Sequence, residues 1–140
     1  MFEPSDNQVR HLEIIQDVIN RMATNTFALK VLAGILAAAI LAYAGAAKDV
    51  HAVLVWTGVI PIGAFWYLDT RYLRLQNLFR KLYDAVRKGN VEEPFDMNIS
   101  RFDSEVPNHL DIAWSWSVRD FYLALVAILL LVSFVLKLTD

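Results

Sequence analysis

The sequence predicts an all-α integral membrane protein with three transmembrane helices, the first two of which extend into a cytoplasmic antiparallel coiled-coil hairpin. The first observation is composition: 56% of the 140 residues are hydrophobic, and they gather in three runs. Each run approaches the length of about 20 residues that a helix needs to cross a hydrocarbon core. The second is that the middle run continues into a charged segment without Gly or Pro at the junction. The third is that apolar residues across this join recur at alternating spacings of three and four, as in a coiled coil.

Residues 1–26 are predicted to form a cytoplasmic amphipathic helix. Ser5 and Gln8 have the spacing of a capping box, so the helix should begin there. Nothing as far as Ala46 breaks a helix except two tolerable glycines, so this helix should continue into the membrane. Its apolar seam consists of Leu12, Ile15, Ile19 and Met22.

The first transmembrane helix is predicted over 27–47, with Lys30 near its cytoplasmic edge. Small residues repeat every four positions along it, at Gly34, Ala38 and Ala42. Small side chains let helix backbones approach closely in lipid, where no hydrophobic effect drives association. Two interpretations stay open: this stripe packs the helix within one subunit, or it joins copies of the chain into a homo-oligomer.

A short external turn at 48–49 should lead into the second transmembrane helix, 50–68, which makes the two helices antiparallel neighbours. Gly58, Pro61 and Gly63 lie in the middle of this span. A proline there can kink a helix, and neighbouring helices often repair the lost hydrogen bond. The group is therefore either a static kink, which we favour, or a gating hinge.

The antiparallel register sets Lys30 beside Asp69 at the predicted membrane boundary. Charges within a membrane usually mark functional sites. Because both residues lie at the headgroup level, we favour a plain anchoring ion pair here.

The segment 69–88 is predicted to be the second cytoplasmic amphipathic helix. It holds six bases and two acids, whereas residues 1–29 hold four acids and two bases. We therefore expect the acids Glu13 and Asp17 to lie near bases of this helix, namely Arg80, Lys81 and Arg87. Its apolar seam consists of Leu68, Tyr72, Leu75, Phe79, Leu82 and Val86. The predicted packing or oligomerisation residues are the small-residue stripe together with Leu12, Ile15, Ile19, Leu75, Phe79 and Leu82.

Residues 89–119 are predicted to be an ordered, acidic cytoplasmic connector. Lys88-Gly89-Asn90 is typical of the C-cap of the preceding helix. Three apolar residues then alternate with polar ones, which indicates an extended stretch whose apolar side rests on the helices. These residues are Phe95, Met97 and Ile99.

The third transmembrane helix is predicted over 120–137. It is short, but Trp114, Trp116 and Tyr122 can lie at one interface while Lys137 reaches the other. Most of the Lys and Arg residues lie in the leader and in the long segment after the second span. By the positive-inside rule the N-terminus and that segment are cytoplasmic, and the C-terminus is external.

The sequence predicts no enzyme. It has no cysteine, and His11, His51 and His109 lie in separate contexts without metal-ligand spacing. No Gly-rich phosphate loop, nucleophile elbow or HExxH motif is present, so we expect no catalytic residue, cofactor or metal site. The basic face after the second span is typical of a solvated surface that fixes topology, with anionic lipid as an alternative partner. It lacks interleaved aromatic residues, so duplex nucleic acid is not expected as a partner.

Three stretches carry a resemblance: LEIIQDVINRMATNTFALK at Leu12–Lys30, FWYLDTRYLRLQNLFRKLYD at Phe65–Asp84, and PFDMNISRF at Pro94–Phe102. They resemble a family of small three-span bacterial membrane proteins, members of which occur among anti-phage defence genes. The membrane effector of the Hailong defence system, which is paired with a nucleotidyltransferase, is one such protein to which the chain is similar. The resemblance implies a small oligomeric effector of the bacterial inner membrane that disrupts or depolarises the membrane when infection is sensed.

The leading functional hypothesis is an oligomeric pore or channel controlled through its cytoplasmic helices. Its expected partners are the lipid bilayer, further copies of itself, and a cytoplasmic partner protein or nucleotide-type signal. The alternative is a non-conducting anchor or scaffold that recruits a cytoplasmic enzyme. Since the spans are almost wholly apolar, any conduction path would close as a hydrophobic gate rather than through a charged filter.

Overall fold

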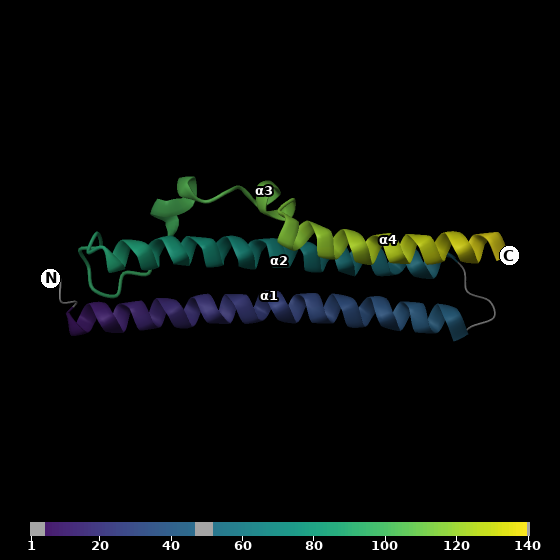
Figure 1. Cartoon of the computed structure of the whole chain (residues 1–140), viewed down its shortest axis with the longest axis horizontal. Helices are drawn as coiled ribbons and strands as arrows, with labels where there is room; N and C mark the ends of the chain where they lie inside the picture. Colours follow the sequence, from purple (N-terminus) through teal and green to yellow (C-terminus); the bar gives the residue numbers. More distant parts are fainter. Residues whose placement is uncertain (1–4, 47–51, 140) are drawn as a thin grey trace.

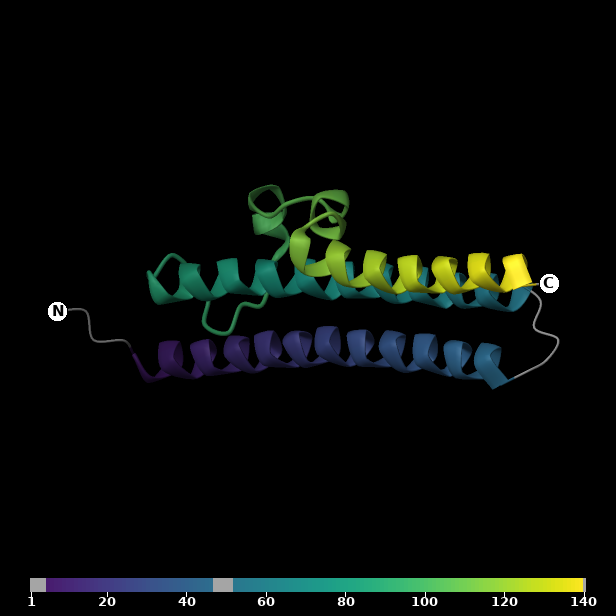
Figure 2. The ribbon, with the colours of Figure 1, turned by 45° about the vertical axis from the view of Figure 1, so that its right-hand side comes forward.

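The computed structural model describes residues 5–46 and 52–139, and every regular element in these ranges is helical. The elements in chain order are α1 (Asp6–Ala46), α2 (Ala52–Arg87), the 3-10 helix η1 (Ser100–Glu105), α3 (His109–Ala113) and α4 (Trp116–Thr139). α1 and α2 run antiparallel along the molecule, and α4 lies beside the half of α2 that is nearer its N-terminus (Figures 1 and 2). The predicted all-α class is confirmed.

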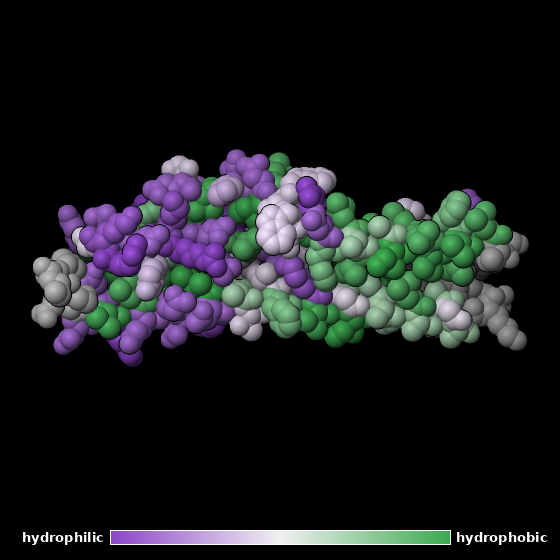
Figure 3. Space-filling view, in the orientation of Figure 1, coloured by the Kyte–Doolittle hydropathy of each residue, from purple (hydrophilic) through white to green (hydrophobic). Residues whose placement is uncertain are grey.

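Two of these helices, α1 and α4, are long enough and apolar enough to cross a membrane. The surface divides along the long axis into a hydrophilic half and a hydrophobic half, with α4 in the hydrophobic half (Figure 3). α4 begins at Trp116, four residues before the predicted third span. The predicted external turn at 48–49 lies outside the described residues, as does the start of the predicted second span.

The N-terminus of α1 has half of the predicted capping box. Ser5 Oγ accepts a hydrogen bond from the Gln8 backbone N–H at 3.2 Å, which satisfies one of the free donors of the first turn. The Gln8 side chain does not fold back to complete the box. It donates instead to the backbone oxygen of Val86 at 2.7 Å and so joins the start of α1 to the end of α2.

The predicted C-cap of α2 is confirmed. Gly89 has a φ of 74°, the left-handed conformation that glycine adopts at little cost. The Gly89 N–H donates to Val86 and the Asn90 N–H donates to Ala85, at 3.0 and 2.9 Å. These two bonds form a Schellman motif, which explains why the helix ends at Arg87.

Two hydrophobic cores lie one after the other along the molecule. In the hydrophilic half, α1 and α2 share a core with the connector; its buried members are Ile15, Ile19, Leu78, Leu82, Val86, Phe102, Val106 and Ile112. In the hydrophobic half, α1 and α2 share a core with α4; its buried members are Ala33, Ala37, Ile62, Val118, Tyr122 and Leu129. α2 therefore contributes to both cores and is the central helix of the molecule.

The connector after α2 only partly matches the expected extended stretch. Met97 and Ile99 pack against the first core, as the alternation predicts. Phe95 does not continue the extended conformation, because its φ is 63°. The Asp96 N–H reaches back to the Glu93 oxygen at 3.4 Å, so residues 93–96 form a turn with Pro94 and Phe95 at its centre. Proline favours the first central position of such a turn, which is why the alternation fails here.

Candidate functional site

The structure brings the two predicted boundary charges together. Lys30 Nζ of α1 donates to Asp69 Oδ2 of α2 in an ion pair. The Asp69 side chain is 0% exposed, and the Lys30 side chain is 23% exposed. Burying a charge is costly unless it is paired, so the fully buried Asp69 carboxylate depends on Lys30 as its counter-ion.

Aromatic side chains next to this pair tie α2, α3 and α4 together. The Trp66 ring stacks on the Tyr122 ring with centroids 5.9 Å apart and meets the Trp114 ring edge-on at 6.1 Å. Trp66 Nε1 donates to the Ala113 oxygen at 3.1 Å, and the Tyr122 hydroxyl donates to the Phe65 oxygen at 3.4 Å. This aromatic layer draws on three elements, and Tyr122 is the member that interacts with the Asp69 carboxylate.

The Asp69 carboxylate also faces α4. The Tyr122 hydroxyl interacts with it electrostatically and as a side-chain hydrogen-bond donor, although Asp69 Oδ1 has no partner at strict hydrogen-bond geometry within the described residues. Thr70, the next residue, donates its hydroxyl to the Trp66 oxygen instead. The buried carboxylate therefore has polar contacts from two other helices, Lys30 of α1 and Tyr122 of α4.

The small-residue stripe of α1 is not what packs α1 against its neighbours. Ala38 and Ala42 are exposed, and a side chain added at Gly34 would meet open space. The buried small residues of this helix are Ala33, Ala37 and Ala44. Of the two open interpretations, packing within one subunit therefore uses neighbouring positions, which leaves the stripe uncovered.

The predicted seam residues divide into three groups. Ile15, Ile19 and Leu82 are buried in the first core, and Leu12 and Phe79 pack at its edge. Leu75 instead joins Leu68, Arg71 and Tyr72 around an open groove of about 230 Å³.

Buried positions near this groove are displaced from the predicted seam. Asp69 and Gln76 are buried, each one residue after a predicted seam position. Asp69 faces α1 to reach Lys30, and Leu68 is then exposed while Leu75 is half-buried beside the groove.

The three predicted hinge residues have different surroundings. Gly58 is buried, and a Cβ built on it would overlap Ile40 Cδ1 of α1 while touching Leu129 of α4. A Cβ on Gly63 would meet nothing. Pro61 lies inside α2, which is helical on both sides of it. Gly58 therefore lies where three helices meet, and a methyl group there would displace the end of the Ile40 side chain.

Within the described residues, no ion pair joins Glu13 or Asp17 to the expected bases of α2. Lys81 pairs with Glu105 of the connector at 3.5 Å, and Arg87 pairs with Asp84 within its own helix at 3.4 Å. Glu13 pairs with Arg10.

Two acids of the connector pair with two basic residues of α2, Arg74 and Lys81. Arg74 binds Asp103 at 3.1 Å and also donates to the Pro107 oxygen. Together with the Lys81–Glu105 pair, this contact holds η1 against α2. These contacts could not be predicted from the sequence, because the acids of the connector follow no regular spacing.

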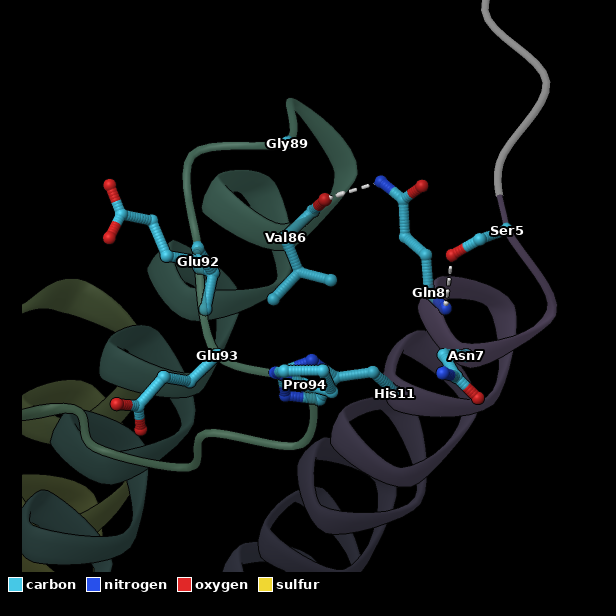
Figure 4. Close-up of a pocket in the computed structure, with 10 residues that line it drawn as sticks. Ser5, Asn7, Gln8, His11, Val86, Gly89, Glu92, Glu93 and Pro94 are labelled. Atoms are coloured by element: carbon cyan, nitrogen blue, oxygen red, sulfur yellow. Dashed lines mark hydrogen bonds between the residues drawn. The ribbon is translucent and has the colours of Figure 1, made fainter.

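A second polar feature, which sequence analysis missed, lies where α1 begins and α2 ends. A cleft of about 200 Å³ is lined there by Ser5, Asn7, Gln8, His11, Val86, Gly89, Val91, Glu92, Glu93 and Pro94. The Gln8 side chain crosses toward Val86, while Glu92 and Glu93 extend away from His11 (Figure 4). His11 is buried, and its Nε2 lies 2.9 Å from the Asp96 oxygen. The contact between His11 of α1 and Asp96 of the connector therefore closes one side of the cleft.

Neither place holds a set of residues typical of catalysis. Within the described residues there is no group of three or more His, Cys, Asp or Glu side chains that could hold a metal ion. Comparison of the chain with protein-family models, with curated proteins and with solved structures finds no match. The arrangement around Lys30 and Asp69 is thus the best-defined candidate site, and its chemistry is that of a buried charge pair linking helices.

Proposed function

We propose that this chain is an oligomeric effector of the bacterial inner membrane that forms a gated pore. In this proposal the hydrophobic halves of α1, α2 and α4 are three transmembrane helices, and the hydrophilic half of α1 and α2 is a cytoplasmic coiled-coil hairpin. The hydrophobic surface of one half of the molecule and the distribution of Lys and Arg support this orientation. The resemblance to membrane proteins found among anti-phage defence genes supports a role in such defence.

Self-association is supported by the stripe of Gly34, Ala38 and Ala42, of which Ala38 and Ala42 are exposed and Gly34 is half-buried within the described chain. Helices in lipid associate where small residues let their backbones come close. A surface of this kind on α1 suits contact with a further copy of the chain, so we assign the stripe to the interface between subunits.

The observation that carries the gating proposal is that α1 is one unbroken helix of 41 residues that passes the buried ion pair. A movement imposed on its cytoplasmic end by a partner or signal is carried rigidly to its membrane half. The Lys30–Asp69 contact resists that movement, because separating the charges leaves a buried carboxylate without its counter-ion. In the proposed mechanism, breaking this contact opens a path between apolar helices.

Ion flux from liposomes tests the proposal. The protein is reconstituted as wild type, as the Lys30→Met/Asp69→Asn double variant, and as the Lys81→Met control, which removes a charge at the surface pair with Glu105. We expect low flux from wild type and the control, and higher flux from the double variant. If none of the three proteins gives ion flux, although each is verified to be a folded oligomer, the pore proposal is wrong.

A non-conducting anchor is the alternative, and one observation favours it. An open, largely apolar groove at the hydrophilic end of the molecule is lined by Val9, Leu12, Glu13, Gln16, Asp17 and Tyr83. A partner enzyme could bind there. The anchor is supported if liposomes carrying the protein recruit a candidate partner from solution while flux stays at background with and without it.

A further inference from the structure

α3 is a short helix with two unlike sides, and it lies just before α4. Ile112 is buried in the first core. On the other side Leu110 is 74% exposed and Trp114 is 58% exposed, and the Trp114 N–H bonds to the Leu110 oxygen, which places the two one turn apart. Trp116, at the start of α4, is 77% exposed. Three large apolar side chains are therefore presented to the surroundings within seven residues.

The position of this patch along the molecule is fixed by a hydrogen bond. Trp66 Nε1 of α2 donates to the Ala113 oxygen of α3. Trp66 lies one turn before Asp69 on the same helix, so the patch lies at the level of the buried ion pair. This is also where the hydrophilic surface gives way to the hydrophobic surface (Figure 3).

The chemistry of the patch matches the zone of a bilayer where lipid headgroups meet acyl chains. An indole ring combines a large apolar body with one N–H donor, and neither Trp114 nor Trp116 has a hydrogen-bond partner for its side chain in the described part of the chain. Tryptophan is enriched where lipid headgroups meet acyl chains, because that zone accommodates both parts of the ring. Exposed apolar residues of α4, such as Leu123, continue from the patch into the hydrophobic half.

We propose that the α3–α4 junction lies on the cytoplasmic surface of the bilayer, with Leu110, Trp114 and Trp116 inserted among phospholipid headgroups. This inference rests on the proposed membrane-spanning arrangement and adds to it a residue-level contact with lipid. The junction fixes how deeply the chain is inserted. Because Trp66 joins α3 to the helix that carries Asp69, the bilayer surface is mechanically connected to the ion pair.

The absence of cysteine makes a site-specific test direct. Leu110→Cys is labelled with a fluorophore sensitive to polarity, and Asp111→Cys, an exposed polar neighbour, is the matched control. Leu123→Cys reports on the proposed span. The labelled proteins are reconstituted in liposomes that contain lipids brominated either near the carbonyl groups or near the middle of the acyl chains.

We expect the label at position 110 to shift to shorter wavelength and to be quenched mainly by the shallow bromines. The label at 111 should stay in water, and the label at 123 should be quenched by the deep bromines. If 123 is quenched and 110 behaves like 111, the lipid contact of α3 is wrong while the spanning arrangement stands. If 123 is not quenched, both are wrong. Shielding of 110 from water without quenching by lipid would indicate a protein contact and overturn the proposal.

Discussion

At the scale of single residues, the two members of the Lys30–Asp69 pair differ in burial, so losing one should cost more stability than losing the other. Asp69 is fully buried, whereas part of Lys30 reaches the surface. Losing the lysine therefore leaves a charge with no route to water, but losing the aspartate does not. Truncating one partner of a buried pair is far more damaging than replacing both with uncharged groups of similar size.

We predict that Lys30→Met lowers the free energy of unfolding in detergent by about 3 kcal/mol. Asp69→Asn should cost less, and the double variant should recover most of the loss, because no unpaired charge remains. Tryptophan fluorescence during denaturation measures all three. The control, Lys81→Met, breaks an exposed pair and should cost less than about 1 kcal/mol. Additive losses in the double variant would show that the two residues are not coupled.

A second residue-scale prediction concerns the glycines of α2. Gly58→Ala should destabilise the protein by up to about 1 kcal/mol, because the new methyl group forces the end of the flexible Ile40 side chain to move and the helix propensity of alanine offsets part of that cost. Gly63→Ala is the matched control, and it should be neutral or stabilising, since its Cβ meets open space and alanine favours helix. Adding Ile40→Ala to Gly58→Ala should restore part of the loss. Equal effects at both glycines, measured by thermal unfolding, would contradict the packing explanation.

At the scale of elements, α2 is a continuous helix that changes neighbours. It packs against the connector in one half and against α4 in the other. α1 contributes to the core in both halves. Pro61 lies in the half that packs on α4, and α2 stays helical through it. Packing around Gly58 therefore holds the middle of α2, which favours a static proline over a moving hinge.

We predict that Pro61→Ala stabilises α2 and leaves liposome flux unchanged. Alanine supplies the N–H that proline lacks, and the gain should be less than the roughly 3 kcal/mol that proline costs in an isolated helix, since neighbouring helices already support this region. Unfolding in detergent measures the gain, and the flux of the charge-neutral double variant at Lys30 and Asp69 provides a signal to compare. Loss of that flux on adding Pro61→Ala would identify Pro61 as a hinge.

At the scale of the whole molecule, the uncovered small-residue stripe is the surface that our proposal assigns to assembly. We predict that Ala38→Leu disrupts the oligomer, because a larger side chain keeps neighbouring helices apart. Ala39→Leu is a matched control on the same helix, also exposed but outside the stripe. Chemical crosslinking in liposomes should show oligomers for wild type and Ala39→Leu and monomers for Ala38→Leu. Identical crosslinking patterns for the two variants would show that the stripe is not part of the interface between subunits.

Several features of the fold follow from the sequence without any long-range information. Ser5 and Gly89 set helix ends through bonds to residues close in the chain, and such local chemistry is visible in the sequence. The long helices follow from apolar runs without breakers. The meeting of Lys30 and Asp69 also follows from the predicted short turn. Two helices joined by a short turn run antiparallel, so residues equally far from the turn in sequence lie side by side.

Only the tertiary structure decided which faces of these helices are buried. Periodicity placed the apolar Leu68 in the core and not the charged Asp69, although Asp69 is the buried one. In the small-residue run, where neighbouring positions are alike, periodicity could not separate Gly34 from Ala33. The ion pair and the packing of α4 determine which of these positions is buried.

The same holds for the connector, whose acids and aromatic residues have no period. Their contacts with Arg74 and Trp66 arise because η1 and α3 are held against α2. The sequence by itself thus determined the long helices, the helix ends at Ser5 and Gly89, and the meeting of Lys30 with Asp69. The buried faces and the docked connector depend on contacts between residues far apart in the chain, which no local pattern encodes.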